Sequence, residues 1–177
     1  MCKIRLFDSE GNDLGWDKQH LGLAYSYGKN RKHGGILAKD AVSKLLSDVP
    51  LVNYTAFDLN SLQELQDIIG DMPMVLDDDY IDINPLWKKG KKIVINRDNV
   101  EEFVRSRNTS KDYSNKTRMQ RQKLYIQTYI NQLKTQLTND YSTTLQKMYN
   151  FYSKLTTNIT LKEIDSYAEM ILNYSID

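Results

Sequence analysis

The side chains with the clearest chemical potential in this sequence are arginines that fall in two nearby segments. Arg105 and Arg107 stand two residues apart, and Arg118, Arg121 and Gln122 follow. Residues 118 and 122 would share one face of a helix, with residue 121 close by. A guanidinium offers a planar fork of donors that fits phosphate oxygens, and a helix start adds free N–H groups. The spacing therefore points to a phosphate or pyrophosphate site, and it leaves open a solvated arginine cluster with no ligand.

The charge of the chain is divided unevenly along its length. The 177 residues carry a formal net charge of +1, yet the segment 88–123 holds twelve Lys and Arg against four Asp and Glu. A basic stretch of this kind binds a polyanion or forms a solvated face. No recognisable nucleic-acid-binding motif accompanies it, and the remainder of the chain is net acidic. We therefore expect no nucleic-acid partner.

The residue inventory disfavours several other kinds of chemistry. One cysteine, Cys2, excludes an internal disulfide framework, and together with His20 and His33 it supplies fewer than the four Cys/His ligands of a usual structural zinc site. With only two histidines, the chain offers few candidates for a Ser–His or Cys–His nucleophile pair. The P-loop, nucleophile-elbow and His-Glu-x-x-His motifs are absent from the sequence. Three adjacent aspartates at 77–79 point in different directions, so we favour a solvated loop and assign no metal ligand.

The elements that must position these side chains are predicted by hydrophobic periodicity. Alternation favours strands at 3–7, 52–56, 74–76 and 91–95, and helical spacing favours helices over 36–46, 61–69 and 98–104. A strand, a helix and a strand follow one another between residues 52 and 76, which predicts a βαβ-type element. The segment 21–27 fits either a strand or a helical turn. The fold class predicted from this order is α/β.

The last third of the chain predicts helices alone. One long helix should begin near Ser114 and end at Asn139-Asp140, a second should follow, and a third should begin at Thr160, where Glu163 completes a capping box. Their apolar stripes read as core-facing surfaces. No apolar run approaches the length of a membrane span, and no signal peptide opens the chain. We expect this chain to be soluble.

Several segments resemble, in order, the domain of the LytR–CpsA–Psr family. The family's C-terminal signature is similar to Phe103-Val104-Arg105-Ser106-Arg107, then Asp112, then Arg118-Met119-Gln120-Arg121-Gln122. Upstream, the matching segments are Ala24-Tyr25-Ser26-Tyr27-Gly28, the helix at 41–46, the strand and helix at 52–70, and Trp87-Lys88-Lys89-Gly90. The likeness covers about residues 1–137 in one register.

The resemblance implies an α/β fold in which helices flank a mixed central β-sheet, with a helical C-terminal portion. Residues 1–137 would form the LytR–CpsA–Psr-like domain, lacking its N-terminal strands, and residues 138–177 a helical extension of the same domain. The family's early Asp-Ser strand, its Pro-Arg-Asp segment and its membrane anchor find no counterpart here. We therefore expect an N-terminally shortened form of a membrane-anchored protein whose domain lies outside the cell.

The resemblance also implies an activity. Proteins of this family move a glycopolymer, such as wall teichoic acid or capsule polysaccharide, from polyprenyl pyrophosphate to peptidoglycan or another wall acceptor, chiefly in Gram-positive bacteria. By position, Arg105, Arg107 and Asp112 would be catalytic. The substrate-binding residues would be Arg118, Arg121 and Gln122.

The cofactor that the resemblance implies is Mg²⁺. Its acidic ligands would lie upstream of this chain, so we expect weak Mg²⁺ binding and an incomplete enzyme here. The alternative is a non-catalytic module that binds polyprenyl phosphate or an anionic polymer.

Overall fold

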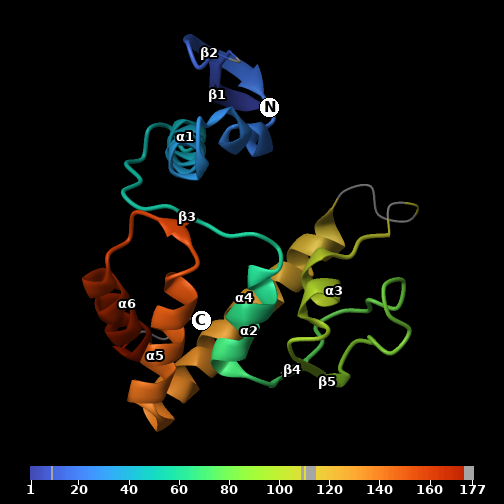
Figure 1. Ribbon diagram of the computed structural model, residues 1–177. Helices are drawn as coiled ribbons and strands as arrows, with labels where there is room; N and C mark the ends of the chain where they lie inside the picture. Colours follow the sequence, from blue (N-terminus) through green and yellow to red (C-terminus); the bar gives the residue numbers. More distant parts are fainter. Residues whose placement is uncertain (9, 109, 111–114, 174–177) are drawn as a thin grey trace. The chain divides into compact units, whose positions relative to one another are not determined.

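The computed structural model describes residues 1–8, 10–108, 110 and 115–173 (Figure 1). Its strands are β1 (Cys2–Phe7), β2 (Asp13–Gln19), β3 (Thr55–Ala56), β4 (Met72–Val75), β5 (Lys92–Ile95) and β6 (Thr156–Thr157). Its α-helices are α1 (Arg31–Leu45), α2 (Ser61–Ile69), α3 (Val100–Arg105), α4 (Lys116–Asn139), α5 (Tyr141–Tyr152) and α6 (Leu161–Asn173). In these ranges no helix combines the length and apolarity needed to cross a membrane.

The chain divides into two compact units that are described separately. Unit 1 comprises residues 1–57 and 153–161, and unit 2 comprises 58–152 and 162–177. In unit 1, β1 and β2 form an antiparallel hairpin and α1 packs against β1. The late segment 153–161 returns to unit 1 because β6 pairs antiparallel with β3. Asn158 secures this return, since its Oδ1 accepts from the Tyr54 N–H at 2.8 Å.

Local sequence explains how unit 1 begins its helix. Asn30 caps α1, because its side chain accepts from the His33 N–H at 2.9 Å and so satisfies a free donor of the first turn. Gly28 precedes the cap, and a Cβ built there would lie 2.2 Å from the backbone nitrogen of Gly34. Only glycine fits this approach without moving the backbone. The small core beneath contains Cys2, Ile4, Ala24 and Ala41.

Unit 2 holds the larger core, and α4 is its longest element. Every fourth residue of α4 from Arg121 is buried, namely Arg121, Tyr125, Tyr129, Leu133 and Leu137. This row packs with α2, α3 and α5 and with the β4–β5 hairpin. Helix α2 ends at Gly70, whose φ of 69° lies in a region that L side chains rarely adopt.

The expected α/β class and the helical C-terminal part are confirmed. The long helix ends at Asn139, next to the expected break, and the ambiguous segment 21–27 forms two 3₁₀ turns, η1 (Leu21–Leu23) and η2 (Tyr25–Tyr27). The described strands pair into three two-stranded sheets. The boundary after Leu137 stays a prediction.

The βαβ-type element is wrong. A βαβ unit needs parallel strands, but β4 pairs antiparallel with β5, and β3 pairs with β6. The cause is the closed loop between β4 and β5. The Leu76 N–H donates to Lys91 O at 3.0 Å, and the Gly90 N–H donates to Leu76 O at 2.8 Å. These bonds turn the chain back, so β5 becomes the partner of β4.

Candidate anion-binding site

The arginine-bearing segments meet where the end of α3 contacts the start of α4. An Arg121 Nη2 N–H donates to the Ser106 carbonyl, and the Gln122 side-chain amide donates to the Val104 carbonyl at 3.2 Å. Val104 and Ser106 alternate along the chain with the two upstream arginines. These bonds therefore hold residues 104–107 against the first turns of α4, and both arginine segments contribute to one region of unit 2.

Arg105 and Arg107 are exposed within this region. Arg105 forms an ion pair with Glu101 one helical turn earlier, and Arg107 donates to the Asn115 side chain. Asn115 precedes α4 in a left-handed conformation with φ 61°. Exposed ion pairs contribute only about 0–1 kcal/mol, so Arg105 can exchange Glu101 for another anion at little cost.

Arg121 is buried, with 1% of its surface exposed. Its Nε and Nη1, together with Nε of Arg118, are buried and have no hydrogen-bond partner among the described residues. Burial is the main influence on the Arg121 guanidinium and lowers its pKa, and the neighbouring charge of Arg118 acts in the same direction. An arginine nevertheless stays protonated in proteins. The region thus holds two close cations with unsatisfied donors.

The Arg121 guanidinium lies over an aromatic ring that belongs to an aromatic cluster. Its central carbon lies 5.6 Å from the centre of the Tyr80 ring, and the Tyr80 hydroxyl donates to Asp77 Oδ1 at 2.7 Å. Tyr80 in turn meets Phe103 edge to face, and Phe103 meets Trp87 in the same way. Burial raises the pKa of Tyr80, so its hydroxyl stays protonated. Sequence reasoning did not identify Tyr80; the only signal was its position beside the aspartate run.

This arrangement is suited to an oxyanion. Most buried polar groups in proteins have hydrogen-bond partners, so unpaired guanidinium donors are unusual and call for an explanation. A phosphate supplies several charged oxygens that pair with such donors in strong hydrogen bonds. The site therefore has the chemistry of a phosphate or pyrophosphate site. The individual catalytic and binding roles of Arg105, Arg107, Arg118, Arg121 and Gln122 stay predictions.

The described residues do not supply an Mg²⁺ site. Asp112, the predicted catalytic acid, lies outside the described residues. Within the described ranges no three His, Cys, Asp or Glu side chains gather in a way that would hold a metal ion. In the aspartate run, Asp77 accepts from Tyr80, and Asp79 Oδ1 accepts from the Lys89 N–H at 2.8 Å. Magnesium therefore stays a prediction from the resemblance.

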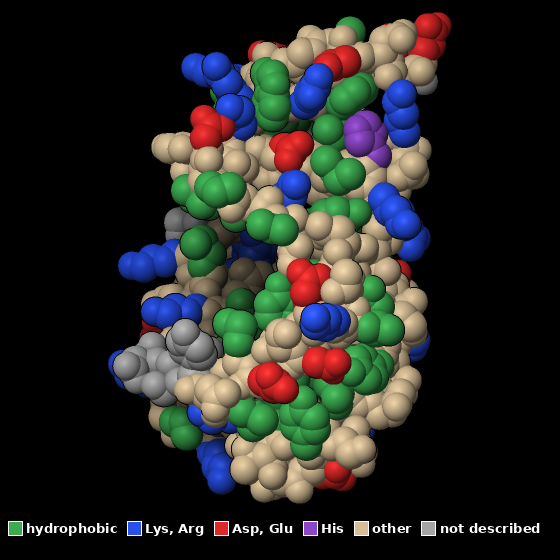
Figure 2. Space-filling view, turned by 90° about the vertical axis from the view of Figure 1, so that its left-hand side faces the viewer, with side chains coloured by type: hydrophobic (Ala, Val, Ile, Leu, Met, Phe, Trp, Pro, Cys, Tyr) green, Lys and Arg blue, Asp and Glu red, His purple; other side chains and the backbone are tan. Residues whose placement is uncertain are grey.

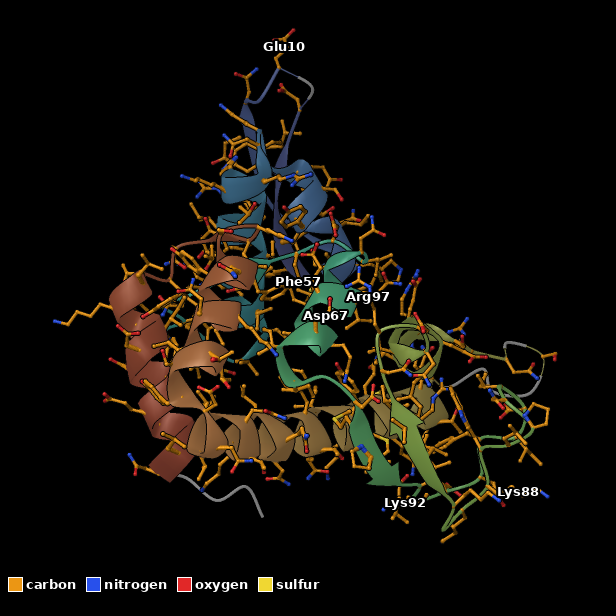
Figure 3. The ribbon with its side chains drawn as sticks, turned by 60° about the horizontal axis from the view of Figure 1, so that its bottom comes forward. Glu10, Phe57, Asp67, Lys88, Lys92 and Arg97 are labelled. Carbon is orange, nitrogen blue, oxygen red and sulfur yellow. The ribbon has the colours of Figure 1, made fainter. Side chains whose placement is uncertain are left out.

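The rest of the basic stretch is dispersed. Arg97 forms an ion pair with Asp67 of α2, and Figure 3 shows these two side chains together. Lys92 begins β5, and Lys88 lies in the loop before it, both exposed. Figure 2 draws the left-hand side of the view in Figure 1, and on that face basic, acidic and apolar side chains are interspersed. Among the described residues of the stretch, the arginines of the two segments gather where α3 meets α4.

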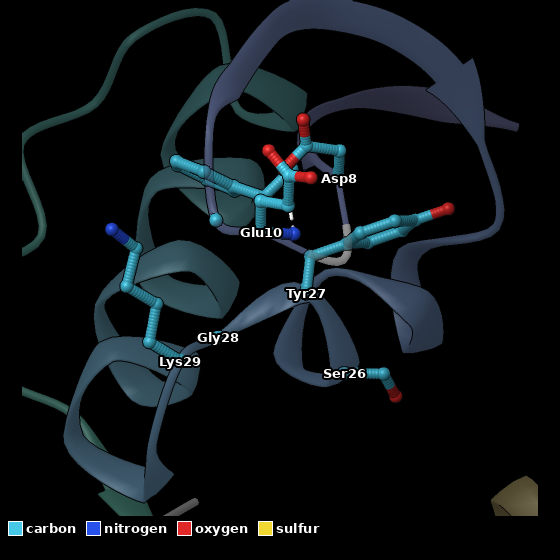
Figure 4. Close-up of a pocket in the computed structure, with 8 residues that line it drawn as sticks. Asp8, Glu10, Ser26, Tyr27, Gly28 and Lys29 are labelled. Carbon is cyan, nitrogen blue, oxygen red and sulfur yellow. Dashed lines mark hydrogen bonds between the residues drawn. The ribbon is translucent and has the colours of Figure 1, made fainter.

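Two surface depressions suit an anion less well, although the first shares Arg105 and Ser106 with the arginine region. One adjoins α3 and is lined by Asp98, Glu101, Glu102, Arg105 and Ser106, so its carboxylates outnumber its single cation. The other, in unit 1, measures about 500 Å³ and is lined by Phe7, Asp8, Glu10, Gly11 and residues 26–29 (Figure 4). There the Asp8 carboxylate accepts from the N–H groups of Glu10 and Asn12, and hydrogen bonds from Asn12 lower its pKa.

Comparison with solved structures places this fold in a known class. The Lin1025 protein from Listeria innocua matches with a TM-score of 0.64 and 22% identity, over 97% of this chain and 64% of that one. TagV from Bacillus subtilis matches with a TM-score of 0.64 and 16% identity, over 98% and 63%. TagT, solved bound to LI-WTA, matches with a TM-score of 0.61 and 17% identity, over 90% and 56%. The chain thus spans less than two thirds of each of these structures.

Sequence comparison identifies the family. No curated protein matches the chain, but the profile of the LytR_cpsA_psr family matches residues 8–177. The chain therefore belongs to the LytR–CpsA–Psr family, which confirms the resemblance noted in its arginine and Ala-Tyr-x-Tyr-Gly segments.

Proposed function

We propose that this chain is part of a cell-wall glycopolymer phosphotransferase and binds the phosphate groups of its lipid-linked substrate. Family membership supports this role, as do the similar folds of TagV and of TagT, the latter bound to LI-WTA. The observation that carries the proposal is the pair Arg118 and Arg121, whose buried guanidinium nitrogens lack partners among the described residues.

The substrate we propose is a glycopolymer on polyprenyl pyrophosphate, with peptidoglycan or another wall glycan as acceptor. Arg118 and Arg121 would bind the pyrophosphate from α4, while the exposed Arg105 and Arg107 would bind it from the end of α3. Gln122 would support them, because its amide already fixes the Val104 carbonyl. The polymer would be teichoic acid or capsule polysaccharide, and the protein that contains this chain would be anchored in the membrane of a Gram-positive bacterium with the domain outside.

The reaction would be attack by an acceptor hydroxyl on the β-phosphorus that carries the polymer. A new bond forms between the hydroxyl oxygen and phosphorus, and the bond from the bridging oxygen to the β-phosphorus breaks. Polyprenyl phosphate leaves, and the hydroxyl proton passes to a base, for which the family resemblance offers Asp112. The arginines would stabilise negative charge that develops on the phosphoryl oxygens and on the leaving phosphate.

A second candidate is a module that binds lipid phosphate without turnover. It is favoured by the finding that the described residues gather no metal-binding carboxylate cluster. Both candidates require the same arginines, so binding and turnover must be measured separately.

Binding is tested by calorimetric titration of the 177-residue chain with farnesyl pyrophosphate. Arg118→Met removes one guanidinium and retains the length of the side chain. We expect it to weaken binding at least about 10-fold, as expected for loss of a charge-assisted hydrogen bond. Arg97→Met is the matched control, because Arg97 belongs to the same basic stretch but pairs with Asp67. Equal affinity of the Arg118 variant and the wild-type chain would overturn the proposal.

Turnover is tested by incubating the chain with a lipid-linked oligosaccharide and a wall glycan and following release of polyprenyl phosphate. Release that depends on the acceptor supports the transferase. Tight binding without release supports the binding module.

A further inference from the structure

We propose that Tyr80 and Asp77 are positioning residues that hold the Arg121 guanidinium in place for an oxyanion. This inference rests on the proposed function, and it assigns a role to the loop that follows β4. Tyr80 would act through the face of its ring, and Asp77 would act by fixing that ring.

The contacts form a chain from the aspartate run to the arginine. Asp77 Oδ1 accepts from the Tyr80 hydroxyl at 2.7 Å, and the Tyr80 ring centre lies 5.6 Å from the Arg121 guanidinium carbon. The Tyr80 N–H donates to Trp87 O at 2.8 Å, which fixes the backbone beneath the ring. Tyr80 is itself 1% exposed, so its ring has little freedom to move. A cation over the face of an aromatic ring is attracted by the ring's quadrupole.

The hydrogen bonds of Arg121 are distributed in a way that favours a ligand. Only Nη2 has a partner, the Ser106 carbonyl, whereas Nε and Nη1 are buried without one among the described residues. A ring face attracts the positive charge but occupies none of the in-plane N–H donors. The surroundings thus hold the guanidinium and leave two of its buried nitrogens unpaired among the described residues.

The described carboxylates around Arg121 do not pair with its unpaired nitrogens. Asp82 and Glu102 lie near enough to stabilise the charged form of Arg121 electrostatically, but neither forms an ion pair with it in the described part of the chain. Asp77 is committed to Tyr80. A guanidinium held by a ring, one carbonyl and carboxylates that do not pair with it keeps both its charge and its unsatisfied donors, which is the preorganisation that anion binding requires.

Four variants test the role, with inorganic pyrophosphate as the probe in calorimetric titrations of the whole chain. Tyr80→Leu removes the ring, and we expect pyrophosphate binding to weaken about 10-fold, as for loss of a desolvated cation–π contact. Tyr80→Phe keeps the ring and loses only the bond to Asp77, so a smaller loss of about 3-fold is expected. Arg121→Met should weaken binding at least as much as Tyr80→Leu. Tyr141→Leu, at a partly exposed position on α5, is the control.

Two readouts separate positioning from general stability. In the Arg121→Met background, Tyr80→Leu should weaken pyrophosphate binding no further, because both changes remove the same interaction. The Nε–H resonance of Arg121 should move when Tyr80 is replaced by Phe, and it should move again on titration with pyrophosphate. A purely structural Tyr80 would give additive losses and an arginine resonance unaffected by pyrophosphate.

The outcomes distinguish this inference from the proposed function. If Arg118→Met and Arg121→Met weaken pyrophosphate binding while folded Tyr80→Leu does not, the positioning role is wrong and the proposed site stands. If Arg118→Met also binds normally, the proposed function fails with it. Should Tyr80→Leu fail to fold, Tyr80→Phe decides: unchanged affinity together with an unmoved Arg121 resonance overturns the inference.

Discussion

The buried bond between Tyr125 and Gln66 makes a prediction about how α4 is held under the site. Tyr125 lies one turn after Arg121 in the same buried row, and its hydroxyl donates to Gln66 Oε1 at 2.9 Å. Gln66 is fully buried, and its amide nitrogen donates to Gly70 O at 2.7 Å and to Ile95 O at 3.4 Å. One side chain of α2 thereby connects α4, the end of α2 and β5.

Tyr125→Phe removes the hydroxyl and leaves Oε1 of Gln66 buried without its donor. A buried acceptor that loses its partner costs about 1–3 kcal/mol, and we expect unit 2 to lose about 2 kcal/mol of unfolding free energy. With a urea m-value of about 2 kcal/mol/M, the unfolding midpoint should fall by about 1 M. Tyr141→Phe, at a partly exposed tyrosine, should change the midpoint little.

Urea unfolding can be assigned to unit 2 because the chain has two tryptophans, one in each unit. In a Trp16→Phe background, fluorescence reports on Trp87, which is buried in the larger core. A double-mutant cycle with Gln66→Met should give a coupling energy of about 1–2 kcal/mol between the two side chains. A loss below about 0.5 kcal/mol for Tyr125→Phe, or a coupling energy near zero, would refute the reasoning.

Three further predictions concern other contacts. Gly28→Ala should destabilise unit 1 by about 1–3 kcal/mol, because the new Cβ meets the α1 backbone, and Trp16 fluorescence in a Trp87→Phe background should show an earlier urea transition. Asn158→Ala should lower the free energy of unfolding of unit 1 by about 1 kcal/mol, because the Asn158 side chain forms hydrogen bonds with the backbone of Tyr54 and Val52. An unchanged midpoint of the Trp16 transition would contradict this. Tyr149 donates to Asp165, which raises its pKa to about 12. Folding favours the neutral phenol, so the contribution of Tyr149 to the free energy of unfolding is complete below pH 10 and is lost as the pH rises toward 12. Tyr149→Phe should remove this part of the stability loss at alkaline pH, which is measured by unfolding followed by helical circular dichroism.

The sequence was sufficient to predict most helices, because each depends on signals within a few residues. The apolar spacing before Asn139-Asp140 and the glycine after Ile69 mark helix ends, and α4 and α2 end there. Strand pairing was harder to predict, because pairing depends on contacts between distant residues. The partner of β3 is a two-residue strand a hundred positions later, and no local pattern in either segment specifies it.

The candidate site was predicted in part. Arginine spacing located the two segments, but it gave no indication that Arg121 is buried while Arg105 and Arg107 are exposed. A signal for this existed, because residue 121 begins the row that continues through Tyr125, Tyr129 and Leu133 at intervals of four. Tyr80 could not be found in this way, since its contact with Arg121 joins a loop to a helix forty residues away.

The same side chains that would bind the substrate also stabilise the local structure. Helix α3 has six residues, which is too short to be stable alone in water. Its end is fixed because Gln122 and Arg121 donate to the carbonyls of Val104 and Ser106. Those carbonyls flank Arg105 in the sequence, so the bonds also restrict where Arg105 can lie.

Ligand binding and local folding should therefore be coupled at this point. If an oxyanion pairs with the unsatisfied donors of Arg118 and Arg121, it binds the folded arrangement and not the unfolded chain. Such a ligand must stabilise unit 2 by RT ln(1 + [L]/Kd), where [L] is its free concentration. Pyrophosphate should accordingly raise the Trp87 unfolding midpoint and leave the Trp16 midpoint unchanged. A purely structural arginine cluster would give no such difference between the two units.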